Sequence, residues 1–156
     1  EQKTEEVTVE CSLQWTAQYS ESIYSFVNNI NTHDGGTHET GFRNALTRIV
    51  NDYARKNNLL KENDSNFTGD DVREGLTAIV SVKVPDPQFE GQTKERLGNR
   101  EVQGVVQSIT AERLSDWLEL NPKLSKEIIN KVVQSKAARE AAQKAKQTVR
   151  RQSALS

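Results

Sequence analysis

The segment from Pro85 to Asn99 holds the side chains best suited to chemistry. It reads Pro-Asp-Pro-Gln-Phe-Glu-Gly-Gln-Thr-Lys-Glu-Arg-Leu-Gly-Asn. Its prolines fix φ and turn the residues before them away from helix, and Gly91 permits a backbone turn that other side chains resist. Such a loop can present the amide of Gln92 and the ammonium of Lys94 to a phosphate, because both groups donate hydrogen bonds. The alternative is that Lys94 is a loop lysine that only faces solvent.

This loop must be held by the elements on either side of it. Leu76 to Val84 alternates apolar and polar side chains, which predicts a strand. Ile79 adds apolar area to the other face, so we expect this strand to be covered on both sides. After the loop, apolar residues at helical spacing predict a helix that begins near Asn99 and ends at Asn121-Pro122.

Further elements are predicted upstream of this strand. Val7 to Trp15 alternates without a break and predicts a strand with one buried face. Ser22–Ile30 is rich in apolar and aromatic side chains, and we expect it to pair with that strand as a hairpin. A helix with one apolar stripe begins near Thr37 and ends around Lys56-Asn57-Asn58, and Gly69–Glu74 forms a short helical turn.

The last element is a long helix from about Ser125 to Ser153. Its first part is apolar, and its second part is rich in alanine, which has the highest helix propensity. At 1.5 Å per residue this helix would be roughly 40 Å long, too long and too basic to lie in a core throughout. We expect its second half to protrude or to pack against another domain. The order of elements, β-β-α-β-α-α, indicates an α+β domain with a helical arm.

Composition limits the kind of protein this can be. With 156 residues, 34% hydrophobic and 28% charged, the chain has room for one small-cored domain, or for one domain and an appendage. No apolar run approaches the roughly 18 residues of a membrane span, and no signal-peptide pattern is present. The single cysteine, Cys11, excludes an internal disulfide, fits a reducing compartment and should be a buried thiol. The absence of methionine leads us to expect a piece of a larger polypeptide.

Charge is unevenly distributed along the chain. Residues 123–151 contain nine basic and two acidic side chains, a net charge of +7, whereas the whole chain carries −1 and the remainder therefore −8. A basic helix on an acidic body suggests contact with a polyanion such as nucleic acid. The alternative is a solvated helix face.

Polar side chains gather in the sequence around the start of the first helix, at His33, Asp34, His38 and Glu39. Their spacing matches no zinc framework and there is no second cysteine, so we expect no metal site and assign them to the turn and the helix start. No Ser-His-Asp or Cys-His arrangement, acid–base pair or glycine-rich phosphate loop can be identified. The chain alone therefore shows no complete active site.

Two long motifs resemble the B subunit of bacterial DNA gyrase. Residues 34–43 read Asp-Gly-Gly-Thr-His-Glu-Thr-Gly-Phe-Arg, and residues 69–76 read Gly-Asp-Asp-Val-Arg-Glu-Gly-Leu. The second motif is followed by Val-Ser-Val-Lys-Val-Pro-Asp-Pro-Gln-Phe-Glu-Gly-Gln-Thr-Lys and by Leu-Gly-Asn. The resemblance covers about Val7 to Leu155, including Leu118–Pro122 and the basic arm. The topoisomerase IV paralogue ParE shares much of the pattern, but the motifs lean towards gyrase.

In that family this region is the transducer domain, which implies an α+β fold similar to domain 2 of ribosomal protein S5 with a left-handed β-α-β crossover. We therefore expect a transducer body over residues 1–122. Residues 123–156 would form a long basic helix that leads towards a TOPRIM domain, which this chain lacks. The family's ATP site lies in a preceding GHKL-type domain, also absent, so the chain alone should neither hydrolyse ATP nor supercoil DNA.

The resemblance also implies roles for particular residues. By position, Lys94 resembles the switch lysine that reaches the γ-phosphate of ATP and serves catalysis, and Gln92 resembles its glutamine partner in binding the nucleotide. Arg43 resembles an arginine that faces the cavity for the transported DNA segment. The basic arm would add DNA contacts through Arg139, Lys144, Lys146, Arg150 and Arg151. The family commonly has lysine at the position of Gln152, so one positive charge is missing here.

The implied function is that of a mechanical module in an ATP-dependent type IIA DNA topoisomerase, coupling nucleotide state to DNA-gate closure and strand passage. The implied cofactors are ATP, bound mainly outside this chain, and Mg2+ in the whole enzyme. The implied partners are DNA, gyrase A and a second copy of gyrase B, with no membrane, in a bacterial cytoplasm or in a plastid if the host is eukaryotic. The alternative is a stand-alone nucleic-acid-binding module that uses the basic helix.

Overall fold

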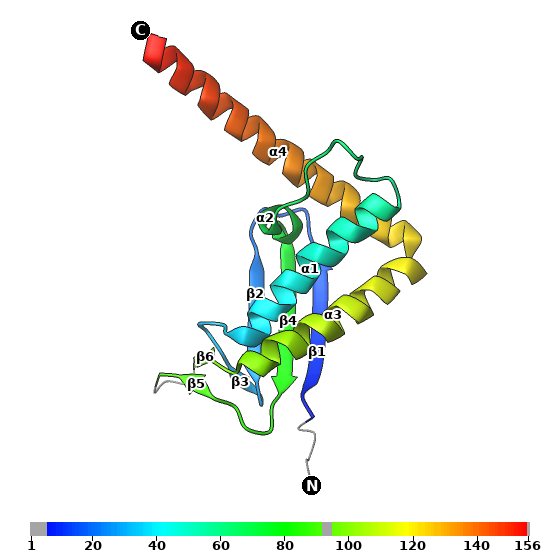
Figure 1. The fold of residues 1–156 in the computed structure, drawn as a ribbon, viewed down its shortest axis with the longest axis vertical. Helices are drawn as coiled ribbons and strands as arrows, with labels where there is room; N and C mark the ends of the chain where they lie inside the picture. Colours follow the sequence, from blue (N-terminus) through cyan, green and yellow to red (C-terminus); the bar gives the residue numbers. More distant parts are fainter. Residues whose placement is uncertain (1–5, 92–94, 156) are drawn as a thin grey trace.

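A curved sheet covered by helices on one face makes up the body of the molecule, and one long helix extends away from it (Figure 1). The computed structural model describes residues 6–91 and 95–155. The elements in chain order are β1 (Thr8–Trp15), β2 (Ser22–Val27), β3 (Ile30–Asn31), α1 (Thr37–Lys56), α2 (Gly69–Arg73), β4 (Leu76–Lys83), β5 (Phe89–Glu90), β6 (Arg96–Leu97), α3 (Arg100–Leu120) and α4 (Pro122–Leu155). The predicted strands and helices are thus confirmed, and the short strands β3, β5 and β6 are additions.

The four-stranded sheet has the order β1-β4-β2-β3, so the predicted hairpin between β1 and β2 is wrong. Strand β2 instead pairs in parallel with β4, with Ile23 opposite Ala78, while β1 pairs antiparallel with the other side of β4. Strands β4 and β2 therefore take the two interior places in the sheet. The apolar and aromatic side chains of β2 indicate a strand, but they carry no information about its partner.

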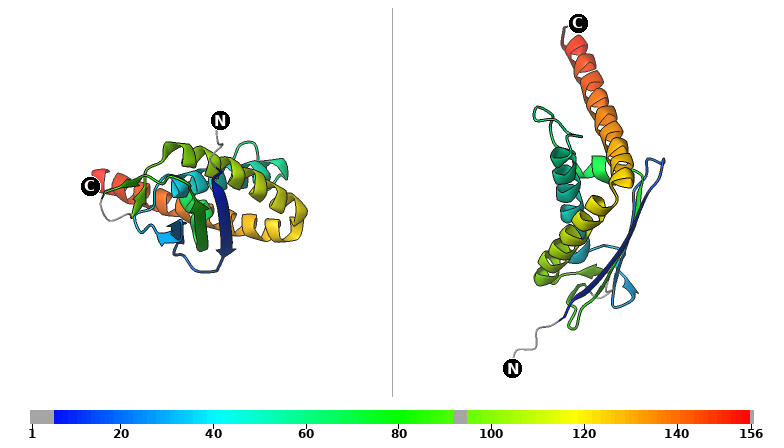
Figure 2. Two further views of the ribbon diagram at one scale, coloured as in Figure 1. Left: turned by 90° about the horizontal axis from the view of Figure 1, so that it is seen from below. Right: turned by 90° about the vertical axis from the view of Figure 1, so that its right-hand side faces the viewer.

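Helices cover only one face of this sheet. In the edge-on view of Figure 2, α1 and α3 lie on the same side of the strands. Strand β4 accordingly alternates buried and exposed side chains, and Ile79 on its outer face is 45% exposed. The expectation that this strand is covered on both sides is therefore wrong. In this mixed arrangement, one sheet face meets the core and the other meets solvent.

Helix α1 supplies the centre of the core. Its apolar stripe is buried against the sheet and α3, with Phe42, Leu46 and Val50 fully inaccessible. The helices α1 and α3 pack closely because Gly41 has no side chain: a Cβ atom at this position would lie 2.4 Å from the carbonyl oxygen of Gln103 in α3. This oxygen belongs to the backbone of α3, so it cannot move aside by a side-chain rotation.

We expect the substitution Gly41→Ala to lower the free energy of unfolding by about 2 kcal/mol, because the methyl group forces α1 and α3 apart. Gly104→Ala is the matched control, since a Cβ at Gly104 meets nothing within 4 Å. Removing a glycine from an exposed helix position should leave stability unchanged or raise it by about 0.5–1 kcal/mol. Urea unfolding measures both, and equal effects at the two positions would contradict this account.

Helix α4 consists of an anchored half and a projecting half. It begins at Pro122, three residues earlier than predicted, at a position where proline's fixed φ suits the first helical turn. Ser125, Ile129 and Val132 are buried against the body, whereas residues 140–155 are exposed throughout. This confirms that the second half protrudes, and Figure 1 shows it leaving the body at the end opposite β5 and β6. None of the described helices is long and apolar enough to cross a membrane.

Candidate functional site

In the sequence, Gln92 and Lys94 lie between the two strands of a small hairpin, β5 and β6. Residues 92–94 lie outside the described residues. On either side of them, Glu90 of β5 pairs with Arg96 of β6. The buried side chain of Asn99 closes the hairpin base: its Oδ1 accepts from the Gln88 N–H at 2.5 Å, and its Nδ2 donates to the Asp86 carbonyl at 3.1 Å. The Leu-Gly-Asn motif thus fixes where the segment begins and ends.

The hairpin is docked on the turn that precedes α1. The Asp34 N–H donates to the Glu95 carbonyl at 2.9 Å, and the Leu97 N–H donates to the Gly35 carbonyl at 3.1 Å. The approach at Gly36 requires glycine, because its φ is +136° and a Cβ there would lie 2.4 Å from the Leu97 carbonyl oxygen. The Asp-Gly-Gly motif therefore joins the segment that holds Lys94 directly to the helix that bears Arg43.

His38 is a core residue in the first turn of α1. It is fully buried, its Nε2 lies 3.0 Å from the Thr32 hydroxyl, and its Nδ1 has no hydrogen-bond partner in the described structure. Burial lowers the pKa of His38 from 6.5 to about 4, opposed by the nearby carboxylate of Glu39. His33 is exposed. Within residues 6–91 and 95–155, no three histidine, cysteine or acidic side chains gather in a way that could hold a metal ion.

We expect stability to fall as the pH drops from about 6.5 towards 4, because the unfolded chain protonates His38 while the folded state resists it. Well above pH 6.5 the histidine is neutral in both states and contributes nothing to the pH dependence. Between pH 7 and pH 5 its share of the loss should be about 2 kcal/mol. Urea unfolding at both pH values should show a smaller loss for His38→Gln than for wild type. An unchanged pH dependence in His38→Gln, or the same reduction in the control His33→Gln, would contradict the assignment.

Arg43 is held between two carboxylates. Its Nη1 lies 2.5 Å from Glu21 and its Nη2 lies 2.7 Å from Glu39, with its side chain 32% exposed. Burial would lower the pKa of Arg43, but the hydrogen bonds and charges of Glu39 and Glu21 outweigh this and raise it. Glu21 also pairs with Arg73 at 3.1 Å. A DNA phosphate that binds Arg43 must therefore compete with Glu21 and Glu39.

The basic stretch of α4 divides into two parts. In the first part, three cations hold the loop and short helix formed by residues 65–74: Lys136 donates to the Ser65 carbonyl at 2.7 Å, and Lys131 donates to the Glu74 carbonyl at 2.8 Å. Arg139 donates to both carboxylate oxygens of Asp71, at 2.9 and 3.1 Å. These cations anchor the helix, and contact between Arg139 and DNA stays a prediction.

Asp71 is the buried acceptor of this anchor. Its side chain is 2% exposed and also accepts from the Thr68 N–H at 2.9 Å, as part of the capping box that starts α2. Burial alone would raise the pKa of Asp71, but the hydrogen bonds from Arg139 and Thr68 outweigh it and hold this pKa below its usual value. The carboxylate therefore stays charged and paired near neutral pH.

The second part of the basic stretch is free of the body. Lys144, Lys146, Arg150 and Arg151 are all exposed on the projecting half of α4. At 100° per residue, Lys146 and Arg150 lie on the same side as Arg139, whereas Lys144 and Arg151 lie on the opposite side. The predicted DNA contacts on the arm are thus not brought to one face, and Arg43 lies on a different element.

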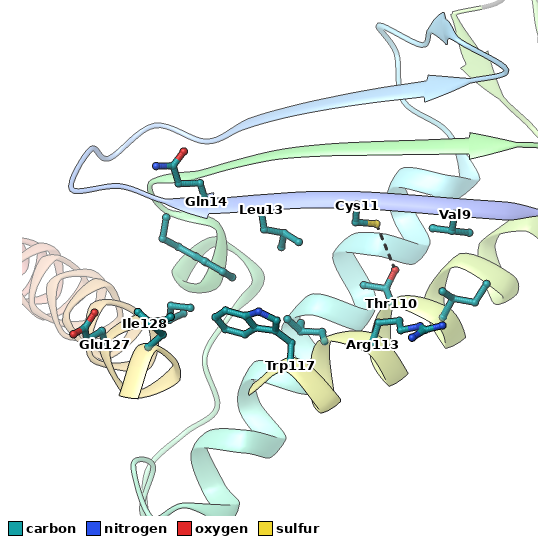
Figure 3. Close-up of a pocket in the computed structure, with 13 residues that line it drawn as sticks. Val9, Cys11, Leu13, Gln14, Thr110, Arg113, Trp117, Glu127 and Ile128 are labelled. Atoms are coloured by element: carbon teal, nitrogen blue, oxygen red, sulfur yellow. Dashed lines mark hydrogen bonds between the residues drawn. The ribbon is translucent and has the colours of Figure 1, made fainter. Parts of the chain in front are cut away.

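An apolar cavity of about 750 Å³ lies between β1, α3 and the start of α4 (Figure 3). Cys11 faces it with its Sγ 4.0 Å from the Thr110 hydroxyl. Cys11 is only half-buried, so the prediction of a buried thiol is met only in part. Burial still raises the pKa of the Cys11 thiol despite this contact, which makes the thiol a poor nucleophile. No pattern in the sequence indicates the cavity, because it arises where α3 packs on α1 and leaves the edge strand β1 partly uncovered.

The mixed sheet with one helical face and a long C-terminal helix matches part of the solved ATPase region of a gyrase B protein and part of a topoisomerase IV ATP-binding domain. The solved 43K ATPase domain of Thermus thermophilus gyrase B superposes with a TM-score of 0.84 at 44% identity, covering 91% of this chain and 38% of that one. The topoisomerase IV ATP-binding domain of Francisella tularensis gives a TM-score of 0.74 at 32% identity, covering 87% of this chain and 37% of that one.

The chain belongs to the DNA gyrase B family, whose sequence model matches residues 1–148. The DNA gyrase B protein of Mycobacterium bovis is 59% identical over 146 residues, which make up 94% of this chain and 20% of that protein. The chain thus spans about one fifth of the length of this relative.

Proposed function

We propose that this chain is the transducer region of a DNA gyrase B protein, with the fold of domain 2 of ribosomal protein S5. It would act within a longer polypeptide that hydrolyses ATP and passes one DNA segment through another, as a type IIA topoisomerase. The observation that carries the proposal is the hydrogen-bonded docking of the hairpin flanking Lys94 on the start of α1. Through this docking, a change of nucleotide contact near the start of α1 would be transmitted to Arg43, which lies about two turns further along the same helix.

In this proposal Lys94 and Gln92 sense the nucleotide. An ammonium and a carboxamide are donors suited to the γ-phosphate of ATP, and charge-assisted hydrogen bonds of this kind are strong. The contact would be lost when the γ-phosphate leaves, so the hairpin would occupy two positions, before and after hydrolysis. The chain would contribute no further part of the nucleotide site, and Mg2+ would accompany ATP in the upstream region.

The DNA contacts in this proposal come from two places. Arg43 would meet the transported segment in a cavity between paired gyrase B chains, at the cost of its ion pairs with Glu21 and Glu39. The division into a body over residues 1–122 and an arm over residues 123–156 separates this contact from the arm. The arm would contact DNA phosphates through Lys144, Lys146, Arg150 and Arg151, while Arg139 would mainly anchor the helix.

The test is ATP-dependent supercoiling by the longer polypeptide combined with gyrase A. Introduction of negative supercoils only in the presence of ATP is the expected result. Relaxation or decatenation without supercoiling would assign the chain to topoisomerase IV instead, and no change in DNA topology would overturn the proposal.

A second function is favoured by the exposed basic half of α4, namely binding of nucleic acid by the chain alone. Its affinity would come from phosphate contacts and would fall steeply as salt increases. We expect only weak binding of this kind, because part of the basic stretch is already engaged with the body. Saturable submicromolar binding of duplex DNA at physiological salt would favour the stand-alone function.

A further inference from the structure

The apolar cavity between β1, α3 and the start of α4 has the size and lining of a small-molecule site. Its volume of about 750 Å³ lies within the range of sites that bury a small organic ligand, about 300–1,000 Å³. All three elements contribute apolar walls, with Leu13 on β1, Leu114 on α3 and Ile128 on α4. None of the residues that line it is assigned to nucleotide or DNA in the proposed function.

Both tryptophans of the chain line this cavity. The ring of Trp15 is held in place, because its Nε1 donates to the Val72 carbonyl at 2.9 Å. Trp117 projects from α3 into the cavity and is 41% exposed, although tryptophan is highly buried on average (Figure 3). Indole rings favour planar aromatic partners, in offset-stacked or edge-to-face contact. The two side chains therefore favour a planar aromatic ligand over a flexible aliphatic one.

Arg113 supplies a cation at one end of the cavity. It is exposed, and within the described part of the chain it has no ion pair or hydrogen bond through its side chain. Of the described residues that line the cavity, only Glu127 is acidic, and it lies at the opposite end, beyond Ile128 (Figure 3). A guanidinium forms bidentate, charge-assisted hydrogen bonds with an acidic group. This cation therefore favours a ligand whose acidic group lies at the Arg113 end.

We propose that this cavity binds a planar aromatic acid, with its ring system against Trp117 and its acidic group at Arg113. The site is additional to the proposed function and does not depend on it. A bound molecule would contact β1, α3 and α4 at once, so it would brace the junction at which the arm leaves the body. The probe for this ligand class is anilinonaphthalene sulfonate, a planar aromatic anion.

The experiment measures alkylation of Cys11 by N-ethylmaleimide in the longer gyrase B polypeptide, followed by peptide-resolved mass spectrometry. Because Cys11 faces the cavity, saturating probe should slow its alkylation by about tenfold or more. Unchanged alkylation would overturn the inference. Failure of Cys11 to react before any probe is added would show that another part of the polypeptide closes the cavity, and it would overturn the inference as well.

The acidic part of the ligand is tested at Arg113. In Arg113→Gln, the probe concentration for half-maximal protection of Cys11 should rise by about tenfold, because a charge-assisted hydrogen bond is lost. Arg100→Gln is the matched control, since Arg100 is exposed on the same helix and does not line the cavity. Phenylnaphthylamine, which lacks the acidic group, should protect wild type and Arg113→Gln equally. Undiminished protection by the acidic probe in Arg113→Gln, or an equal loss in Arg100→Gln, would contradict a site for an acid.

The apolar part of the ligand is tested at Leu124, a half-exposed residue of the cavity lining. Leu124→Asp places a charge that requires water beside the ring system, so both probes should bind about fivefold more weakly. Leu120→Asp is the control, because Leu120 is exposed and does not line the cavity. Unchanged binding in Leu124→Asp, or the same loss in Leu120→Asp, would show that the probes shield Cys11 from elsewhere and would overturn the inference.

Discussion

Replacing Lys94 by alanine in the full-length gyrase B polypeptide should lower ATP turnover by about 100-fold or more. The proposed function supplies the reason: a cation that contacts the γ-phosphate during its transfer would contribute about 3 kcal/mol or more to lowering the barrier, and the variant would lose this contribution. Because Lys94 lies in the sequence between Gly91 and β6, in the segment that joins the two hairpin strands, the variant should fold as wild type does. The measurement is steady-state ATP hydrolysis, with circular dichroism to show that the fold is retained.

The control for this prediction is Lys83→Ala. Lys83 is the last residue of β4 and is exposed. Its replacement by alanine removes one positive charge, as Lys94→Ala does, but leaves the residues between β5 and β6 unchanged. We expect its turnover to match wild type. Full activity of Lys94→Ala would mean that the hairpin is only structural, and the projecting half of α4 would become the main candidate for function.

Replacing Asp71 by alanine should lower the free energy of unfolding by about 3 kcal/mol. Two losses add: the capping interactions at the start of α2 are worth about 1 kcal/mol, and the buried hydrogen bonds to a charged arginine are worth about 1.5–3 kcal/mol. Arg139 is left with its guanidinium partly buried and without its acceptor. The anchored half of α4 should therefore exchange its amide hydrogens faster, in addition to the shift in urea unfolding.

Asp70→Ala is the neighbouring control for this second prediction. Asp70 is 89% exposed and pairs with Arg73 at 3.1 Å; because this carboxylate is open to solvent, the pair should be worth no more than about 0.5 kcal/mol. The two variants remove the same chemical group from adjacent positions and differ in burial. Equal destabilisation by both would show that the pair between Asp71 and Arg139 does not hold the arm.

The elements could be predicted from the sequence, but their partners could not. Alternation from Val7 to Trp15 and the apolar stripe of α1 depend on neighbours a few residues apart, and both predictions are confirmed. Pairing depends on residues far apart: β2 pairs with β4 across about fifty residues, and Asp71 meets Arg139 across 68. Local patterns do not encode such distances, and the predicted hairpin between β1 and β2 is wrong for that reason.

For the candidate site, too, the sequence indicates the local segments but not the contacts between them. The motifs around Asp34 and Asn99 contain glycines and an amide whose turn-forming and capping geometry is local, so the sequence indicates a shaped backbone in both segments. That the turn before α1 and the hairpin contact one another follows only from the fold. Likewise, the basic residues of α4 look alike in the sequence, and only their contacts separate Lys131, Lys136 and Arg139 from the exposed cations near the C-terminus.

The projecting half of α4 also has a mechanical consequence. From its anchor at Arg139 to Leu155 the helix runs sixteen residues further, about 24 Å at 1.5 Å per residue. A stiff rod held at one end works as a lever, so a rotation of the body by about 10° would sweep the tip through about 4 Å over that length. A small tilt where the body holds the helix is thus amplified, with no bond in the arm itself having to change.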